Sequence, residues 1–316
     1  LSYNETADFV LTRVIARVSV PFFFMTTGFF LLPQYLNNSR QKELNPKKIV
    51  SFVKKTAIIY GIAILVYFPV NLYAGNVKWE ESLSLVLLKQ ILFEGTFYHL
   101  WYLPASILGV ILIYLLLRIG KASTIFIVTI ILFIIGLFGD SYYGIIEQVP
   151  ELKNIYTTIF LFSDYTRNGI FFAPVFLMMG GLIAKQKEKY CLRKCLVGLS
   201  ISMILMIAEA ILLHTFKLQR HDSMYFMLLP CMFFLIQLLL LWKGPSYKNL
   251  RNISLLIYLI HPMMIIVVRG FAKVVGIQDL LIGNSVIHYV VVTVVSWIAS
   301  VIIIIFLRKR KGVSLL

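Results

Sequence analysis

Long apolar runs recur along this chain, and they constrain its fold more than any other feature. Each approaches the roughly 20 residues that a helix needs to cross a hydrocarbon core. Backbone groups in lipid must be paired within the spanning segment, which favours helices. We therefore expect an all-α, polytopic transmembrane bundle that forms one domain over residues 1–316. The expected spans are nine: 14–32, 56–73, 98–117, 122–139, 168–184, 194–214, 223–242, 253–271 and 286–308.

The distribution of charge predicts how this bundle is oriented. The net charge of +16 would suit a nucleic-acid-binding protein, but the basic residues are segregated. Twenty of the 30 lie in alternate connections, at 40–55, 118–121, 185–194, 243–251 and 308–311, whereas the opposite connections hold 11 of the 14 acidic residues. The positive-inside rule then places the protein in the plasma membrane with its C-terminus in the cytoplasm. We expect anionic membrane lipids as partners, and no nucleic acid.

Both ends of the chain suggest a longer protein. Nine spans place Leu1 outside the membrane, and delivering it there calls for a preceding helix or a signal peptide. We expect a preceding first helix, which would give ten spans in the full protein. The C-terminal RKRKGVSLL is a basic flank that suits a linker into a cytoplasmic domain. The sequence leaves open whether copies of the chain form a homo-oligomer.

Polar residues inside or beside the apolar runs are candidates for function, because charge at membrane depth is costly. Most of them lie toward the expected outer side, and they predict an outward-facing polar site. The candidates for substrate binding are Arg17, His99, Trp101, Asp140, Arg167, Asn168, Glu209, His221 and Asp222. The alternative for each charged residue is a structural ion pair that holds two spans together.

Helix-breaking residues also interrupt the apolar runs. Prolines occur in six of them, at Pro21, Pro69, Pro104, Pro174, Pro230 and Pro262. Broken helices at membrane depth are tolerated where they line a wet cavity, as in transporters, whereas ordinary kinks need no function. Taken together, the six prolines favour a cavity modestly.

The three cysteines suggest no special chemistry. Cys191 and Cys195 lie in an expected cytoplasmic connection, and Cys231 lies within a span, so we expect reduced thiols. The spacing of Cys191 and Cys195 would allow two metal ligands on one helix face, but no further ligand is close in sequence. We expect no metal site.

Six motifs together resemble a known family. They are ARVSVPFFFMTTGFFLLP at 16–33, YHLWYLPA at 98–105, GDSYYG at 139–144, DYTRNGIFFAPVFL at 164–177, RHDSMYFMLLP at 220–230 and LIYLIHP at 256–262. The chain resembles the acyltransferase-3 family of membrane proteins, and more closely the membrane half of VanT-type serine racemases of vancomycin resistance. The resemblance covers nearly the whole chain.

The resemblance implies a ten-span fold whose first helix precedes this chain. It also implies a cytoplasmic racemase domain that follows the chain and uses pyridoxal phosphate (PLP), so we expect no cofactor within these residues. Acyltransferase-3 enzymes carry a histidine, taken as the catalytic base, on their first helix. That histidine and its nearby arginine have no counterpart that can be assigned here, so the catalytic residues stay unassigned.

Three functions remain open. The first is uptake of L-serine for the protein's own cytoplasmic racemase domain, which makes D-serine for peptidoglycan precursors. The second is transfer of an acyl group to an extracytoplasmic acceptor, with His99 or His261 as acid or base, although a histidine before Pro262 also suits bonding to backbone carbonyls at a kink. The third is a membrane anchor for the racemase.

Overall fold

The structure is a computed structural model that describes residues 5–36, 45–75, 83–188, 190–244 and 250–309. These residues form helices, turns and irregular segments, with no strand among them. The chain divides into two compact units. Unit 2 is Val10–Trp242, and unit 1 joins Leu1–Phe9 to Lys243–Leu316. Each unit is described by itself.

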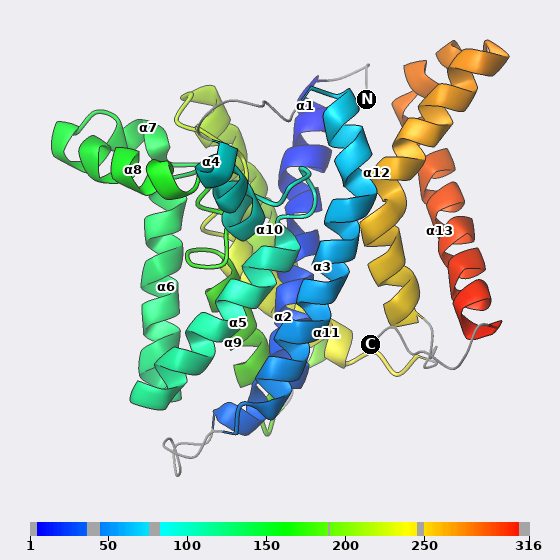
Figure 1. The fold of residues 1–316 in the computed structure, drawn as a ribbon. Coiled ribbons are helices and arrows are strands. Elements are labelled where there is room, and N and C mark those ends of the chain that lie inside the picture. The colour runs from blue at the N-terminus through cyan, green and yellow to red at the C-terminus, as the bar shows by residue number, and fades with distance from the viewer. Residues whose placement is uncertain (1–4, 37–44, 76–82, 189, 245–249, 310–316) are drawn as a thin grey trace. The chain divides into compact units, whose positions relative to one another are not determined.

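The two units contain the following elements. Unit 2 holds η1 (Val10–Val14), η2 (Ile15–Val18), α2 (Ser19–Leu31), η3 (Pro33–Tyr35), α3 (Lys47–Tyr73), α4 (Leu83–Lys89), η5 (Gln90–Glu94), α5 (Tyr102–Ile119), α6 (Ala122–Phe138), α7 (Tyr143–Ile146), α8 (Pro150–Phe162), α9 (Ala173–Ala184), α10 (Leu192–Thr215) and α11 (Leu228–Leu240). Unit 1 holds α1 (Glu5–Phe9), α12 (Leu250–Val275), η6 (Asp279–Gly283) and α13 (Ser285–Lys309). Figure 1 shows this order along the chain.

The all-helical membrane architecture is confirmed. Six described helical segments are long and apolar enough to cross a membrane: Val10–Leu31, Lys47–Tyr73, Tyr102–Ile119, Leu192–Thr215, Leu250–Val275 and Ser285–Leu307. Three shorter apolar helices, α6, α9 and α11, correspond to the other expected spans. Much of the basic set in the alternate connections is described, but Arg40, Lys42, Lys189, Lys248, Arg310 and Lys311 lie outside the described residues.

Several predicted boundaries are wrong. Helices α5, α9 and α11 begin at Tyr102, Ala173 and Leu228, four or five residues after the expected starts. Before α9 and α11, the side chains of Asn168 and Glu209 accept hydrogen bonds from backbone N–H groups and hold irregular turns that compete with the helix. Helix α3 begins earlier than expected, at Lys47, because lysine is a good helix former and is readily solvated at a helix end.

Most of the prolines start helices rather than break them. Pro21, Pro104, Pro174 and Pro230 all lie within the first three residues of α2, α5, α9 and α11. The first N–H groups of a helix have no intrahelical partner, so a proline there costs little. Pro69 and Pro262 do lie inside helices, in α3 and α12. The irregular backbone expected from the other four therefore precedes the helices and does not interrupt them.

The long connection expected at 140–167 carries helical structure of its own. Helices α7 and α8 lie across the end of α6 in Figure 1. Tyr156 on α8 is buried and donates a hydrogen bond to the carbonyl of Ile135 on α6, whereas Ile155 beside it is exposed. Helix α8 thus packs on α6 through Tyr156.

Helices α2 and α9 pack closely enough for their backbones to touch. A Cβ atom added to Gly28 would lie 1.9 Å from the carbonyl oxygen of Leu177, and one added to Gly180 would lie 2.0 Å from that of Met25. Small residues allow this approach, which is a common way for membrane helices to associate. Around the crossing, Phe24, Met25 and Leu177 are fully buried.

The first prediction tests this crossing. Gly180→Ala should lower the stability of the protein by about 1–3 kcal/mol, because the new methyl group meets backbone rather than a flexible side chain. Gly61→Ala on α3 is the matched control, since nothing lies within 4 Å of its added Cβ. Thermal unfolding of the full protein in detergent measures both. Equal melting temperatures for the two variants would contradict the close approach.

Candidate functional site

Irregular segments around residues 140, 165 and 220 come together in unit 2. The carbonyl of Asp140 accepts a hydrogen bond from the N–H of Arg220 at 3.1 Å, and the N–H of Gly144 donates to the carbonyl of Leu218 at 2.7 Å. The hydroxyl of Ser141 donates to the carbonyl of His221 at 3.1 Å. These contacts join the turn after α6 to the segment before α11, and they position Asp140, His221 and Asp222.

Asp140 is fully buried in this junction. Its Oδ1 accepts hydrogen bonds from the N–H groups of Ser223 (2.7 Å) and Met224 (3.0 Å) and from the hydroxyl of Ser141 (3.0 Å). Its Oδ2 is buried with no hydrogen-bond partner among the described residues. Burial raises the pKa of Asp140 to about 6, although the hydrogen bonds and the charge of Arg167 oppose the rise. One carboxylate oxygen therefore binds the fold, and the other is left for a donor.

The guanidinium of Arg167 contacts two aromatic rings. Its guanidinium carbon lies 5.0 Å from the ring centroid of Trp101 and 4.5 Å from that of Tyr165, within cation–π range. Burial lowers the pKa of Arg167, and the like charge of Arg17 acts in the same direction, while Asp140 opposes them. Its Nε is buried with no hydrogen-bond partner among the described residues. Arg167 thus faces the site with an unused donor.

Arg17 and Asp222 bring further charge to the same region. The charge of Arg17 interacts favourably with those of Asp140 and Asp222, and its Nε donates to the carbonyl of Arg13 at 3.4 Å. Asp222 lies 3.6 Å from Nη1 of Arg13. The site therefore contains two arginines, at 17 and 167, whose charges interact with a buried carboxylate, together with the ion pair of Arg13 and Asp222.

Glu209 and Asn168 have their polar atoms engaged by the chain itself. Glu209 on α10 accepts the N–H groups of Phe226 and Met227, just before α11, and the hydroxyl of Tyr142. Both of its carboxylate oxygens are thus bound. Asn168 accepts two N–H groups through Oδ1 and donates from Nδ2 to the carbonyl of Tyr165 and the hydroxyl of Ser163. These contacts give both residues a role in shaping the turns.

The ring of His221 packs against that of Tyr165, with ring centroids 4.3 Å apart and an angle of 32° between the ring planes. Burial lowers the pKa of His221 to about 4, and the nearby cations Arg220 and Arg167 act in the same direction. Its Nε2 is buried with no hydrogen-bond partner among the described residues. At neutral pH the ring is uncharged, so it suits hydrogen bonding better than ion pairing.

The two histidines considered as acid or base lie in different units. His99 is 8% exposed and makes edge-on contacts with Tyr67, Phe97 and Tyr98. His261 belongs to α12 in unit 1, where Nδ1 lies 3.1 Å from the carbonyl oxygen of Ile257 and 3.0 Å from that of Tyr258. This is the backbone contact that a histidine before a proline was expected to make.

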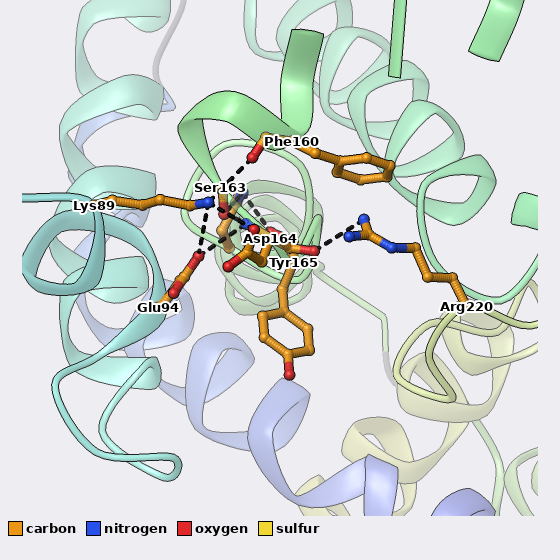
Figure 2. Close-up of polar contacts among 8 residues, drawn as sticks. Lys89, Glu94, Phe160, Ser163, Asp164, Tyr165 and Arg220 are labelled. Atoms are coloured by element: carbon orange, nitrogen blue, oxygen red, sulfur yellow. Dashed lines mark hydrogen bonds and ion pairs between the residues drawn. The ribbon is translucent and has the colours of Figure 1, made fainter. Parts of the chain in front are cut away.

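Two parts of the site were not predicted from the sequence. One is Tyr165, which contacts both Arg167 and His221; its place within DYTRNG was the available signal. The other is a group of ion pairs around Asp164, shown in Figure 2, in which Lys89 lies 2.6 Å from Oδ1 of Asp164. Residues 89 and 164 are too far apart in sequence for their pairing to be read from it. No group of three or more potential metal ligands occurs in the described part of the chain.

The second prediction tests whether Glu209 holds the start of α11. Glu209→Gln should destabilise the protein by about 1–3 kcal/mol, because the amide nitrogen of the new side chain cannot accept a hydrogen bond from the backbone N–H that it would face. Glu147→Gln is the control, since Glu147 makes an exposed ion pair with Lys153 at 3.0 Å, which contributes little. Thermal unfolding in detergent compares them, and equal losses would show that Glu209 does not hold the start of α11.

Comparison with known proteins gives close relatives over nearly the whole chain. Two proteins of Enterococcus faecalis described as amino-acid racemases are 42% and 41% identical over 98% and 96% of this chain. A serine/alanine racemase of Enterococcus gallinarum is 36% identical over 96% of it. The matched regions make up 42%, 43% and 42% of those proteins, so the chain spans about two fifths of their length.

No solved structure matches the chain. The family model described as an acyltransferase domain matches residues 1–305, which is almost the entire sequence. This match agrees with the all-helical membrane fold and with the motifs that surround Arg17, Trp101, Asp140 and Arg167. The chain belongs to the acyltransferase-3 family of membrane proteins, in a branch similar to the membrane portion of serine and amino-acid racemases.

Proposed function

We propose that this chain takes L-serine from outside the cell and supplies it to a cytoplasmic racemase domain of the same protein. In this proposal the C-terminus lies in the cytoplasm, and the D-serine product enters peptidoglycan precursors that confer vancomycin resistance. The racemase names of the relatives support the association with racemisation. Uptake of an amino acid goes beyond those names and rests on the chemistry of the site, whereas the role in resistance rests on the resemblance to VanT-type racemases.

The observation that carries the proposal is that the site contains both a buried donor, Nε of Arg167, and a buried acceptor, Oδ2 of Asp140, with no hydrogen-bond partner among the described residues. A free amino acid presents a carboxylate and an ammonium group, and each needs an opposite charge when water is removed. Nε of Arg167 and the charge of Arg17 suit the carboxylate. Oδ2 of Asp140 suits the ammonium. In this arrangement Trp101 and Tyr165 would keep the guanidinium of Arg167 in its plane.

Acyl transfer is the second candidate, and the family match favours it. His99 is the described histidine of unit 2 that lies in a buried aromatic enclosure, where a ring could hold or release a proton. Consumption of a coenzyme A thioester would distinguish this activity from uptake. A pure anchor would show neither.

Pyridoxal phosphate is expected in the proposed racemase domain rather than here. The cofactor needs a lysine amine for its Schiff base. Lys89, the lysine that lies among the outer polar residues, has its ammonium in contact with Asp164, Glu94 and the carbonyl of Phe160. These residues do not fit the cofactor, and no step is assigned to it in this chain.

The third prediction is loss of uptake when the guanidinium is removed. Full-length protein in proteoliposomes should take up labelled L-serine saturably, and Arg167→Gln should reduce this uptake at least about tenfold, the loss expected for a charged hydrogen bond of 1.5–3 kcal/mol. Lys153→Gln is the matched control, because it removes an exposed cation from the same connection. Uptake no faster than in empty vesicles would contradict the proposal and leave acyl transfer or anchoring.

The fourth prediction concerns pH. Asp140, with its pKa near 6, becomes neutral below that pH and then attracts an ammonium group less, so KM for serine should rise as the external pH falls through about 6. His221 is not the titrating group, because its pKa of about 4 keeps it neutral over this range. The His221→Gln variant should keep the same pH dependence of KM. Loss of that dependence in this variant would assign the titration to His221.

A further inference from the structure

A compact ionic cluster lies beside the candidate site. It consists of Lys89, Glu94, Asp164 and Arg220, which come from α4, η5, the segment after α8 and the segment before α11 (Figure 2). Nζ of Lys89 lies 2.6 Å from Oδ1 of Asp164, 3.7 Å from Oε1 of Glu94 and 3.1 Å from the carbonyl oxygen of Phe160. The cluster therefore connects three parts of the chain that are distant in sequence.

Asp164 is held at both its backbone and its side chain. Its N–H donates to Oε1 of Glu94 at 2.9 Å, and its carbonyl accepts from Nη1 of Arg220 at 3.1 Å. Its carboxylate binds Lys89. Arg220 is fixed in turn by the ring of Phe160, whose centroid lies 3.5 Å from its guanidinium carbon. Charged groups from other segments thus fix the position of this one residue.

The next residues carry the candidate site. Tyr165 follows Asp164 directly and contacts both Arg167 and the ring of His221. Farther along, the segment is held by neutral hydrogen bonds, such as those from the hydroxyl of Thr166 to the carbonyl of Gly136 and from Asn168 to the carbonyl of Tyr165. A shift of Asp164 would move Tyr165, and with it one of the two aromatic rings that contact the guanidinium of Arg167.

We propose that Lys89 and Asp164 are positioning residues for the outer site, with Glu94 and Arg220 as their partners. The ion pairs hold the peptide at 164 so that Tyr165 keeps Arg167 in its plane, facing Asp140. The cluster touches the site through the chain and not through the substrate. As a statement about serine this inference rests on the proposed function, but as a statement about the order of segment 163–168 it stands apart from it.

The side chains of the cluster are partly exposed, which suits ion pairs that order segment 163–168 without being required for the bundle to fold. The Lys89 and Glu94 side chains are 22% and 15% exposed, whereas the Asp164 side chain is 53% exposed. Partly exposed ion pairs contribute modestly one by one, and networks of them contribute more. Removing one member should therefore loosen the segment and leave the bundle folded.

The fifth prediction uses two readouts on the full-length protein. In Lys89→Met, hydrogen exchange of the backbone amides in 163–168 should become about tenfold faster, while exchange in α5 and α9 stays unchanged. KM for serine uptake should rise about fivefold or more, with the maximal rate within about twofold, because binding loses its ordered site. Lys89→Arg should restore both, since it keeps the cation. Asp164→Asn should act in the same direction as Lys89→Met.

Lys153→Met is the control, because Lys153 belongs to an exposed ion pair in the same connection. Unchanged exchange in 163–168 for both Lys89→Met and Asp164→Asn would overturn the positioning role, whatever the uptake shows. Faster exchange together with wild-type protein that takes up no serine would uphold the positioning role and overturn the proposed function instead. Equal effects of Lys153→Met and Lys89→Met would also overturn the inference, since any lost surface cation would then suffice.

Discussion

The candidate site depends on the hydrogen bonds that the buried carboxylate of Asp140 accepts from the backbone. Through Oδ1 it binds two consecutive backbone N–H groups, at Ser223 and Met224, and so joins the turn after α6 to the segment that leads into α11. Without that acceptor, these buried donors would have to be satisfied in another way. The same side chain keeps Oδ2 unpaired among the described residues. Structure and candidate chemistry are thus combined in one residue.

The contrast with Glu209 shows how environment separates two similar carboxylates. Glu209 also binds consecutive backbone N–H groups, at Phe226 and Met227, only a few residues farther along the chain. Both of its oxygens are engaged, and Tyr142 adds a hydroxyl donor. A carboxylate whose two oxygens both bind the chain itself is best explained by the fold. The remaining oxygen of Asp140, near two arginines, is better explained by a ligand.

Close packing of two helices supports the candidate site. The crossing of α2 and α9 brings together the helix that follows Arg17 and the helix that follows Arg167. Gly28 and Gly180 allow the two backbones to touch, and this contact limits how far the two arginines can separate. Holding the like charges of Arg17 and Arg167 at fixed positions is costly because they repel each other. The cation–π contacts of Arg167 and the negative charge of Asp140 offset part of that cost.

The lengths of the apolar runs were enough to predict an all-helical membrane protein, and polar residues inside or beside those runs suggested Arg17, Asp140 and Arg167 as candidates. They were not enough to place the helix starts at Tyr102, Ala173 and Leu228, because a proline can either interrupt a helix or begin one. The tertiary structure also decided which polar residues shape turns, as Asn168 and Glu209 do. It decided as well that Lys89 pairs with Asp164, because contacts between distant segments depend on how the helices pack and leave no periodic signal in the sequence.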